Sequence, residues 1–572
     1  MAETLLSPGV LTRENDLSLL TNPPAPVGAA IIGPTVKGQP NIPTQVTSWS
    51  DYLTKFGGSF VSGSTAEYTY FTSTAAYNYF QAGGTNLLVT RVAHSGSDFT
   101  AATSSQISAS GSGTAITLQT VSYGANQNSS GSEDTSGSLA NGTSTNIRWE
   151  IVSPNFSAGT FNIVVRRGDD NNNNKVALET WTNLSLDPLA PNYISRVIGD
   201  TIYNLSSDET YVEVTGSYAN RSNYIVVKEV NKPTPKFFDN NGIAKAAFTG
   251  SIPVAASGTF GTATGNLSSG SADKYYDAIT DSNIQGLVAT DYSASITLLS
   301  NADEYQYNVI SAPGLTYGNS NGQAQLLNLI NNTRNRADAI AVIDTQLYGG
   351  SVSGANTQAN SIDNSYAATY WPWLQTVDPI TGMLTWVPAS TMIPAVYAFN
   401  DTVAAPWFAP AGINRGGLSD VVRAEKKLTQ SDRDSLYQNK VNPIATFPNQ
   451  GVVVYGQKTL QTQASALDRV NVRRLLIALK DRISTISKTL VFEQNTIATR
   501  NAFLSQVNPY LESVQQQQGL YAFKVVMDDS NNPADVIDRN QLVGAIYIQP
   551  TKTAEFIYLD FNILPTGATF PA

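Results

Sequence analysis

The stretch Val27-Gly28-Ala29-Ala30-Ile31-Ile32-Gly33-Pro34 is the first segment of the sequence with the character of a folded core. Its residues follow one another without a polar side chain, which is typical of a strand buried on both faces. The Gly33-Pro34 pair predicts the turn that ends this strand. A short helix is expected next, capped by Ser48 or Ser50 and ending at Gly57-Gly58. A buried strand followed by a capped helix indicates an α/β fold.

The segments on either side of this unit extend the pattern. Residues 64–82 carry aromatic and alanine side chains at helical spacing and stop at Gly83-Gly84, so they predict a second helix. Residues 86–92 are rich in leucine and valine and predict the following strand. Residues 1–25 contain three prolines and too little apolar surface for a core of their own, so we expect an extended arm.

The α/β pattern is interrupted between about residues 95 and 295. Tracts rich in Ser, Thr, Gly and Asn alternate there with short β-type runs such as residues 161–166, which predicts one or two β-rich domains. The α/β pattern returns with a strand at 305–310, a helix near 321–334 and a buried strand at 337–344. The core is therefore predicted to be discontinuous in sequence.

The C-terminal part of the sequence carries the clearest helical periodicity. One face of a long helix is formed by Leu475, Leu476, Leu479, Ile483, Ile486 and Leu490. A second helix, over about residues 503–514, is expected to kink or break at Pro509 and to end at Gly519. Strands are predicted at 520–527 and 542–549.

These elements predict an α/β (α+β) multidomain protein with a discontinuous α/β core, β-rich inserted outer domains and extended strand arms at both ends. The expected parts are an N-terminal linking arm (1–25), a core domain in two pieces (26–95 and 296–460), a protruding insertion (96–295), a C-terminal inner α/β domain (461–554) and a C-terminal strand arm (555–572).

The composition argues against several kinds of site. With no cysteine and a single histidine, His94, the chain has no residues for a Cys-His pair or a multi-histidine metal site, and we expect His94 to be an ordinary loop residue. Acidic residues (44) outnumber basic ones (34), so direct binding of nucleic acid is not expected. No run approaches 18 apolar residues and the N-terminus lacks the features of a signal peptide, so we expect neither membrane insertion nor Sec-type export.

Two segments come close to known ligand-binding motifs. Residues 33–39 have the glycine spacing of a phosphate loop but lack the Lys-Ser/Thr pair after Gly38. Residues 169–174 resemble the start of a calcium loop, but Asn174 replaces the glycine of the turn and Thr180 the bidentate glutamate, so a hairpin loop is the better interpretation. We therefore expect no cofactor, no metal and no catalytic residues.

Three basic residues form a possible contact strip. Arg469, Arg473 and Lys480 fall within about 40° of one another on the long C-terminal helix, beside its apolar face. A solvated helix face is the usual explanation of such a stripe. The alternative is a strip that contacts an acidic partner.

Short strings in a fixed order resemble one known family. The N-terminal strings are Leu6-Ser7-Pro8-Gly9-Val10 with Arg13-Glu14, then Gly33-Pro34, Phe56-Gly57, and residues 79–84 leading into 88–92. The later strings are Tyr370-Trp371-Pro372-Trp373 and residues 387–390, 405–412, 441–444, 453–460, 472–475, 491–493, 548–550 and 554–557. In these strings the chain resembles the contractile tail sheath proteins of myovirus-type bacteriophages, which are related to the sheaths of contractile injection systems. The resemblance covers roughly 5–95 and 300–563; within 96–295 it is limited to 183–188 and 197–200.

The resemblance implies a non-enzymatic structural protein of the virion, assembled in the host cytoplasm. Its copies would form stacked hexameric rings, a helical tube around an inner tail tube protein, with baseplate and tail terminator proteins at the ends. Irreversible contraction would then drive the inner tube through the host cell envelope.

The chain ends are expected to link the copies. At the N-terminus the predicted linking residues are Gly9, Val10, Leu11, Thr12, Arg13 and Glu14. At the C-terminus, residues 555–563 alternate like a strand with Ile557, Leu559, Phe561 and Ile563 on one face. Unpaired strands of this kind can add to sheets of neighbouring copies. In such a sheath, Arg469, Arg473 and Lys480 are the predicted contacts with an acidic inner tube.

Three alternatives remain at this point. The first is the sheath of an extracellular contractile injection system. The second is a surface-layer or adhesin-type lattice protein, which the cysteine-free, acidic, Ser/Thr/Asn-rich composition would suit. The third is a glycan-degrading virion enzyme, which only the β-rich insertion and spare carboxylates favour.

Overall fold

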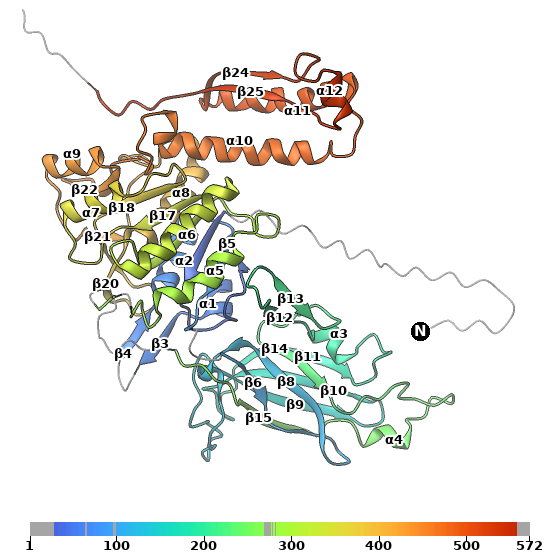
Figure 1. The fold of residues 1–572 in the computed structure, drawn as a ribbon. Helices are drawn as coiled ribbons and strands as arrows, with labels where there is room; N and C mark the ends of the chain where they lie inside the picture. The colour runs from blue at the N-terminus through green and yellow to red at the C-terminus, as the bar shows by residue number, and fades with distance from the viewer. Residues whose placement is uncertain are drawn as a thin grey trace, which may run out of the picture.

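The computed structural model describes residues 28–62, 66–94, 99–267, 276, 278–280 and 282–557. Three large hydrophobic clusters lie within this part of the chain. The first draws on residues 29–92 and 279–477, the second on residues 102–263, and the third on residues 475–527. Figure 1 shows the corresponding parts in a row, with the core between the β-rich insertion and the C-terminal module. The protein is a mixed α/β, multi-sheet molecule.

An eight-stranded sheet forms the centre of the core. Its order is β2-β5-β1-β16-β17-β18-β22-β23. The strands are β1 (Ala29–Gly33), β2 (Thr44–Val46), β5 (Leu87–Arg91), β16 (Val309–Thr316), β17 (Ile340–Asp344), β18 (Ala367–Trp371), β22 (Val441–Phe447) and β23 (Gly451–Val454). The six inner strands are parallel, and the edge strands β2 and β23 are antiparallel to their neighbours. Because β1 pairs with both β5 and β16, the strands before and after the insertion share one sheet.

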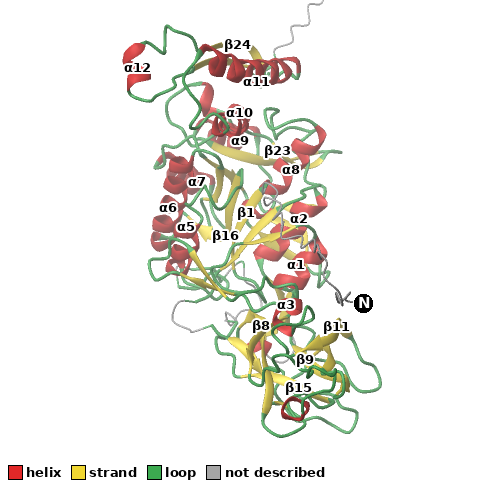
Figure 2. Ribbon diagram, turned by 90° about the vertical axis from the view of Figure 1, so that its right-hand side faces the viewer, coloured by secondary structure: helices red, strands yellow, loops and turns green. Residues whose placement is uncertain are grey.

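Helices cover both faces of this sheet (Figure 2). One face carries α1 (Trp49–Phe56), α2 (Phe71–Gln81) and α8 (Ile393–Val403), and the other carries α5 (Ser293–Leu298), α6 (Ser320–Arg336) and α7 (Val352–Asn360), beside α9 (Gln430–Gln438). Both faces being covered explains why every residue of β1 and β17 is buried. As predicted, the side chain of Ser48 caps α1, and Gly57 ends it with a φ of 72°.

The helix expected over residues 64–82 is shorter than predicted. It begins only at Phe71, because β3 (Ser59–Ser62) and β4 (Ala66–Thr69) form an antiparallel hairpin before it. The aromatic residues of this region alternate with polar ones and pack across the hairpin; Phe60 and Tyr70 stack with ring centroids 4.9 Å apart. These residues therefore form strands, because their alternating side chains pack across the hairpin, although their spacing also fits a helix. A further small sheet is formed by β19 (Leu374–Val377), β20 (Leu384–Val387) and β21 (Val421–Ala424).

The insertion is built on a second, antiparallel sheet in the order β11-β10-β9-β15-β6-β8-β14, with β7 beside β8. Its strands are β6 (Ala101–Ser104), β7 (Ile107–Ser108), β8 (Thr114–Tyr123), β9 (Ile147–Asn155), β10 (Thr160–Arg167), β11 (Ala177–Ser185), β14 (Ile225–Val230) and β15 (Ala256–Gly261). The smaller elements are β12 (Ile202–Leu205), β13 (Val212–Thr215), α3 (Ile194–Ile198) and α4 (Ala246–Thr249). Residues 169–174 lie in the hairpin loop between β10 and β11, as expected, and Asp170 there binds Arg166 at 2.7 and 2.9 Å.

The C-terminal module contains α10 (Val470–Lys488), α11 (Ile497–Gln516), β24 (Leu520–Val526), α12 (Ala534–Asp538) and β25 (Ala545–Pro550). Helix α11 runs through Pro509, which is exposed, without the break that was one of the two expected outcomes. Residues 555–557 of the predicted terminal strand are not in a strand, and residues 558–572 and 1–27 lie outside the described residues. The predicted linking residues Gly9 to Glu14, Leu559, Phe561 and Ile563 fall in those two segments.

Candidate functional site

The carboxyl ends of the parallel strands are filled by the chain's own side chains. In open α/β sheets this edge is where small ligands usually bind. Here the carboxylate of Asp344, at the end of β17, is buried and accepts hydrogen bonds from the backbone N (3.1 Å) and Oγ (2.5 Å) of Ser390. Trp373 is also buried there, and its indole N–H donates to the carbonyl of Gln346 at 2.9 Å. This edge is packed like a core.

Asp344 makes the stability of the core dependent on pH. Burial raises the pKa of Asp344 from its ordinary 3.8 to about 7, although the hydrogen bonds from Ser390 act in the opposite direction. The folded state therefore binds the carboxyl proton of Asp344 more tightly than the unfolded state does. Protonation of Asp344 stabilises the fold fully below pH 4, and this contribution is lost as the pH rises through about 7. Between pH 4 and pH 7, the free energy of unfolding of Asp344→Asn should rise relative to that of the wild type by on the order of 4 kcal/mol, because the variant has no carboxyl group to ionise. Parallel melting-temperature curves of the two proteins between pH 4.5 and 8.5 would contradict this.

His94 has a structural partner. Its Nδ1 lies 3.0 Å from Oδ2 of Asp291, which joins the loop after β5 to the segment that follows the insertion. Among the residues that the structure describes, no group of three or more His, Asp or Glu side chains is arranged to hold a metal ion. No helix in the described ranges combines the length and hydropathy needed to span a bilayer.

The three basic residues predicted to contact an inner tube have different surroundings. Arg469 precedes α10 and binds the carboxylate of Glu555 through Nε at 2.7 Å and Nη2 at 3.0 Å. Arg473 is buried, and its guanidinium lies 3.9 Å from the ring centroid of Tyr366. Lys480 is exposed, with Nζ 3.4 Å from Oη of Tyr366. They do not form one exposed stripe, because Arg473 is buried and only Lys480 is exposed. Contact of these three residues with an inner tube stays a prediction.

Arg474, which the sequence argument missed, attaches α10 to the core. It is 3% exposed, and its Nη2 lies 2.6 Å from Oδ2 of Asp401 at the end of α8. Its guanidinium also lies 4.6 Å from the ring centroid of Tyr397. Helical spacing in the sequence could have identified this residue, because Arg474 falls on the same helical face as the buried Val470 and Ile477. A basic residue on an apolar face predicts a buried partner.

Removing this attachment should destabilise the protein. We expect Arg474→Ala to cost about 3 kcal/mol, because it leaves the Asp401 carboxylate without its cation and opens a gap under α10. The measurement is thermal unfolding followed by near-ultraviolet circular dichroism. Arg482→Ala, which removes an exposed arginine from the same helix, is the control and should leave the melting temperature within about one degree. Equal melting temperatures for the two variants would show that Arg474 does not stabilise the attachment of α10 to the core.

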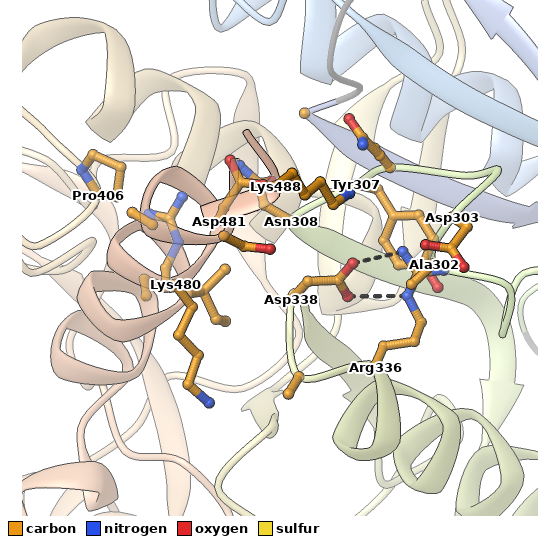
Figure 3. A pocket seen from close by; sticks show the side chains of 17 residues that line it. Ala302, Asp303, Tyr307, Asn308, Arg336, Asp338, Pro406, Lys480, Asp481 and Lys488 are labelled. Atoms are coloured by element: carbon orange, nitrogen blue, oxygen red, sulfur yellow. Dashed lines mark hydrogen bonds and ion pairs between the residues drawn. The ribbon is translucent and has the colours of Figure 1, made fainter. Parts of the chain in front are cut away.

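A cavity of about 570 Å³ lies where α10 faces the core (Figure 3). On the core side, Arg336 binds Asp338 through two hydrogen bonds of 3.0 and 2.8 Å and lies over the ring of Tyr307. Asp481 of α10 points toward Asp338, whereas Lys480 points away from it. Burial raises the pKa of Asp481, and the negative charge of Asp338 raises it further. The cavity is thus a polar seam between two parts of the molecule rather than an apolar ligand pocket.

The hairpin of β24 and β25 forms a sheet of its own. One of its faces packs on α11 through two cross-strand pairs, Phe523 with Ile548 and Val525 with Ile546. On the exposed side, Tyr521 and Tyr547 are each 63% accessible. Within the described part of the chain, β24 and β25 pair only with each other, so each has one open edge. Two-stranded sheets are only marginally stable, and open edges can accept further strands.

Two domain families match the chain. Residues 285–460 match the phage tail sheath protein central domain, and residues 462–564 match the phage tail sheath C-terminal domain. The tail sheath protein of Vibrio phage KVP40 is 40% identical over 240 residues, which cover 41% of this chain and 36% of that protein. The tail sheath protein of Enterobacteria phage T4 is 36% identical over 229 residues, covering 40% of this chain and 35% of that protein.

The matched region thus spans about a third of the length of these curated relatives. A solved structure of a sheath tail protein from Listeria innocua aligns with 92% of this chain and 96% of that chain, with a TM-score of 0.51 and 11% identity. At this identity the likeness establishes the fold only. The chain therefore contains a match to the phage tail sheath central domain followed by a match to the phage tail sheath C-terminal domain, in the order that the sequence strings predicted.

Proposed function

We propose that this protein is the structural subunit of a contractile tail sheath. Its copies form stacked hexameric rings around an inner tail tube, and the sheath contracts irreversibly to drive that tube through the host cell envelope. The observation that carries the proposal is the pair of sheath-family domains over residues 285–460 and 462–564. The role is mechanical and needs no catalysis, in keeping with relatives that are tail sheath proteins. Because these relatives come from phages, we favour a phage tail over an extracellular contractile injection system.

The chain ends link neighbouring subunits in this proposal. Residues 9–14 and 557–563 supply the added strands, and the open edges of the β24–β25 hairpin accept them from other copies. Two observations support this linkage. Apolar residues alternate in the C-terminal segment, and the hairpin has only two strands, a size at which a sheet is only marginally stable without further strands. Each C-terminal module then completes its sheet with strands from other chains.

Such links allow contraction without dissociation. The core, the insertion and the C-terminal module each have their own hydrophobic cluster, so each can rotate and slide as a rigid body. Linking segments keep neighbours at a high effective concentration while their other contacts are exchanged. A change of packing between metastable and stable arrangements therefore supplies the energy, and no nucleotide is required.

The remaining proposed partners follow from the position in the tail. The inner tail tube protein lies inside the sheath, with baseplate and tail terminator proteins at its ends. The protein is then part of the virion and is assembled in the host cytoplasm. Lys480 is the proposed tube contact, because it is the exposed member of the predicted basic set. One exposed charge pair contributes little to the binding energy of a subunit, but the pair is repeated in every subunit along the tube.

Lys480→Gln should weaken binding to the tube. We expect a several-fold loss in the amount of sheath that co-sediments with inner tubes, and a smaller salt dependence, because a screened charge pair has been removed. Lys427→Gln, an equal charge change at another exposed position, is the control. The tube contact is wrong if both variants co-sediment like the wild type at low and at high salt.

Electron microscopy of the purified protein tests the proposal as a whole. We expect striated hollow cylinders. Flat lattices would support the surface-layer alternative, and discrete particles that never polymerise with or without inner tubes would contradict the sheath assignment. Incubation with host polysaccharide should release no sugar, whereas turnover would support the enzyme alternative.

A further inference from the structure

The segment that follows β25 is pinned to its own subunit at every second residue. Residues 551–557 leave the hairpin as an extended segment in which Thr551, Thr553 and Glu555 are partly buried and the residues between them are exposed. The hydroxyl of Thr551 donates to the carbonyl of Gln518 at 2.6 Å. The hydroxyl of Thr553 accepts from Nε2 of Gln457 at 2.7 Å. Residues 551–557, called the strap below, therefore run from the hairpin to the core and are attached to both.

Glu555 is the last and strongest of these attachments. One carboxylate oxygen accepts from Nε of Arg469 at 2.7 Å and from Nε2 of Gln457 at 3.0 Å. The other accepts from Oη of Tyr437 at 2.7 Å and from Nη2 of Arg469 at 3.0 Å. Four hydrogen bonds, two of them in a fork from one guanidinium, fix the carboxylate in position and direction. Just beyond it, Phe556 is 69% exposed and Ile557 is 76% exposed.

The three donors come from separate elements of the core end of the molecule. Tyr437 lies in α9, Gln457 follows β23, and Arg469 is the residue that precedes α10. The ammonium of Lys458 lies 4.6 Å from the ring centroid of Tyr437. Burial acts to raise the pKa of Glu555, but the hydrogen bonds from Arg469, Tyr437 and Gln457 outweigh it and lower the pKa, so the group is ionised at neutral pH. The site is built for a carboxylate.

We propose that Glu555 is the mechanical anchor of the C-terminal linking segment, and that it transmits the pull of a neighbouring subunit to the core instead of to the β24–β25 hairpin. The inference rests on the proposed sheath function. Residues 551–557 continue β25 directly, and among the described strands β25 pairs only with β24, so a pull on its end would open the hairpin one hydrogen bond at a time. A fixed point at Glu555 places the load on α9 and on the start of α10 before it reaches β25.

Pulling on single molecules tests the anchor without sheath assembly. The chain has no cysteine, so Asn331→Cys on the exposed side of α6 and Ala572→Cys at the C-terminus provide unique handles in the full-length protein. We expect Glu555→Gln to extend at about half the force of the wild type, with an early step of the length released when the strap and β25 come away. Equal force curves for the two proteins would overturn the proposal.

Hydrogen exchange checks that the effect is local. In the unassembled protein, Glu555→Gln should speed exchange of the Thr551 amide, which donates to the carbonyl of Gly519 at 3.2 Å, and of the paired β25 amides next to it by about ten-fold, and the double variant Arg469→Glu with Glu555→Arg should restore part of the protection. The control is Asp535→Asn, which removes an exposed ion pair with Arg539 from the same module and should change nothing. Unchanged exchange in Glu555→Gln would overturn the anchor.

The two proposals fail in different experiments. If the wild type forms no tubes, the sheath function is wrong, and the force and exchange results still report whether the strap is anchored. If the wild type forms tubes and Glu555→Gln shows wild-type force and exchange, the sheath function stands and the anchor is wrong.

Discussion

Deletion of residues 1–20 is expected to abolish long sheath tubes while leaving the described fold intact. The strands of the central sheet lie within residues 29–454, so we expect the deleted protein still to fold. Loss of the added strand would leave one edge of each β24–β25 hairpin unpaired and would remove a link from every subunit. We expect the average tube length to fall by at least ten-fold, measured by negative-stain microscopy.

The control for this deletion keeps the length of the arm and removes its ability to pair. Val10→Pro with Thr12→Pro takes two backbone donors out of the proposed strand, since proline has no N–H. This variant should behave like the deletion, whereas Val10→Thr with Thr12→Val should assemble normally. Tubes of normal length from the deletion or from the proline variant would count against linkage by this arm.

Changing the apolar face of the C-terminal segment should have an equally large effect. Leu559, Phe561 and Ile563 alternate with polar or amphipathic residues, so they share one face of a predicted strand. Replacing all three with Asn should leave the monomer folded and prevent tubes longer than a few rings, because the added strand would no longer bury apolar side chains on its neighbour. Sedimentation velocity and microscopy of the same sample give the two readouts.

The opposite face of the same segment supplies the matched control. Tyr558, Asp560 and Asn562 alternate with the apolar set, and replacing them with Ser should be tolerated. Glu555 is left intact in both triple variants, so the anchor to the core is unchanged. Equal assembly by the two triple variants would show that this segment does not pair as a one-faced strand.

Much of the fold could be predicted where the sequence carries a local signal. The buried strand of residues 29–33 and the cap at Ser48 were visible because burial on both faces and capping leave short, specific patterns. The β3–β4 hairpin was missed because aromatic residues at positions such as 68 and 71 fit helical and strand spacing alike. Only packing across the hairpin distinguishes the two.

The site was less predictable than the fold. Helical geometry placed Arg469, Arg473 and Lys480 near one another, but it could not show that Tyr366 covers Arg473 or that Glu555 binds Arg469. These partners lie about 86 to 107 residues away in sequence, so no local pattern encodes them. The family resemblance, by contrast, was carried by ordered short strings, and the domain matches over 285–460 and 462–564 confirm it.

The proposed linkage between subunits is tested most directly by a high-resolution map of the assembled sheath. We predict that strands from neighbouring copies lie along the open edges of the β24–β25 hairpin, one formed by residues 9–14 and one by residues 557–563. A map in which both chain ends fold back on their own subunit, and the hairpin edges carry no strand from another copy, would contradict it.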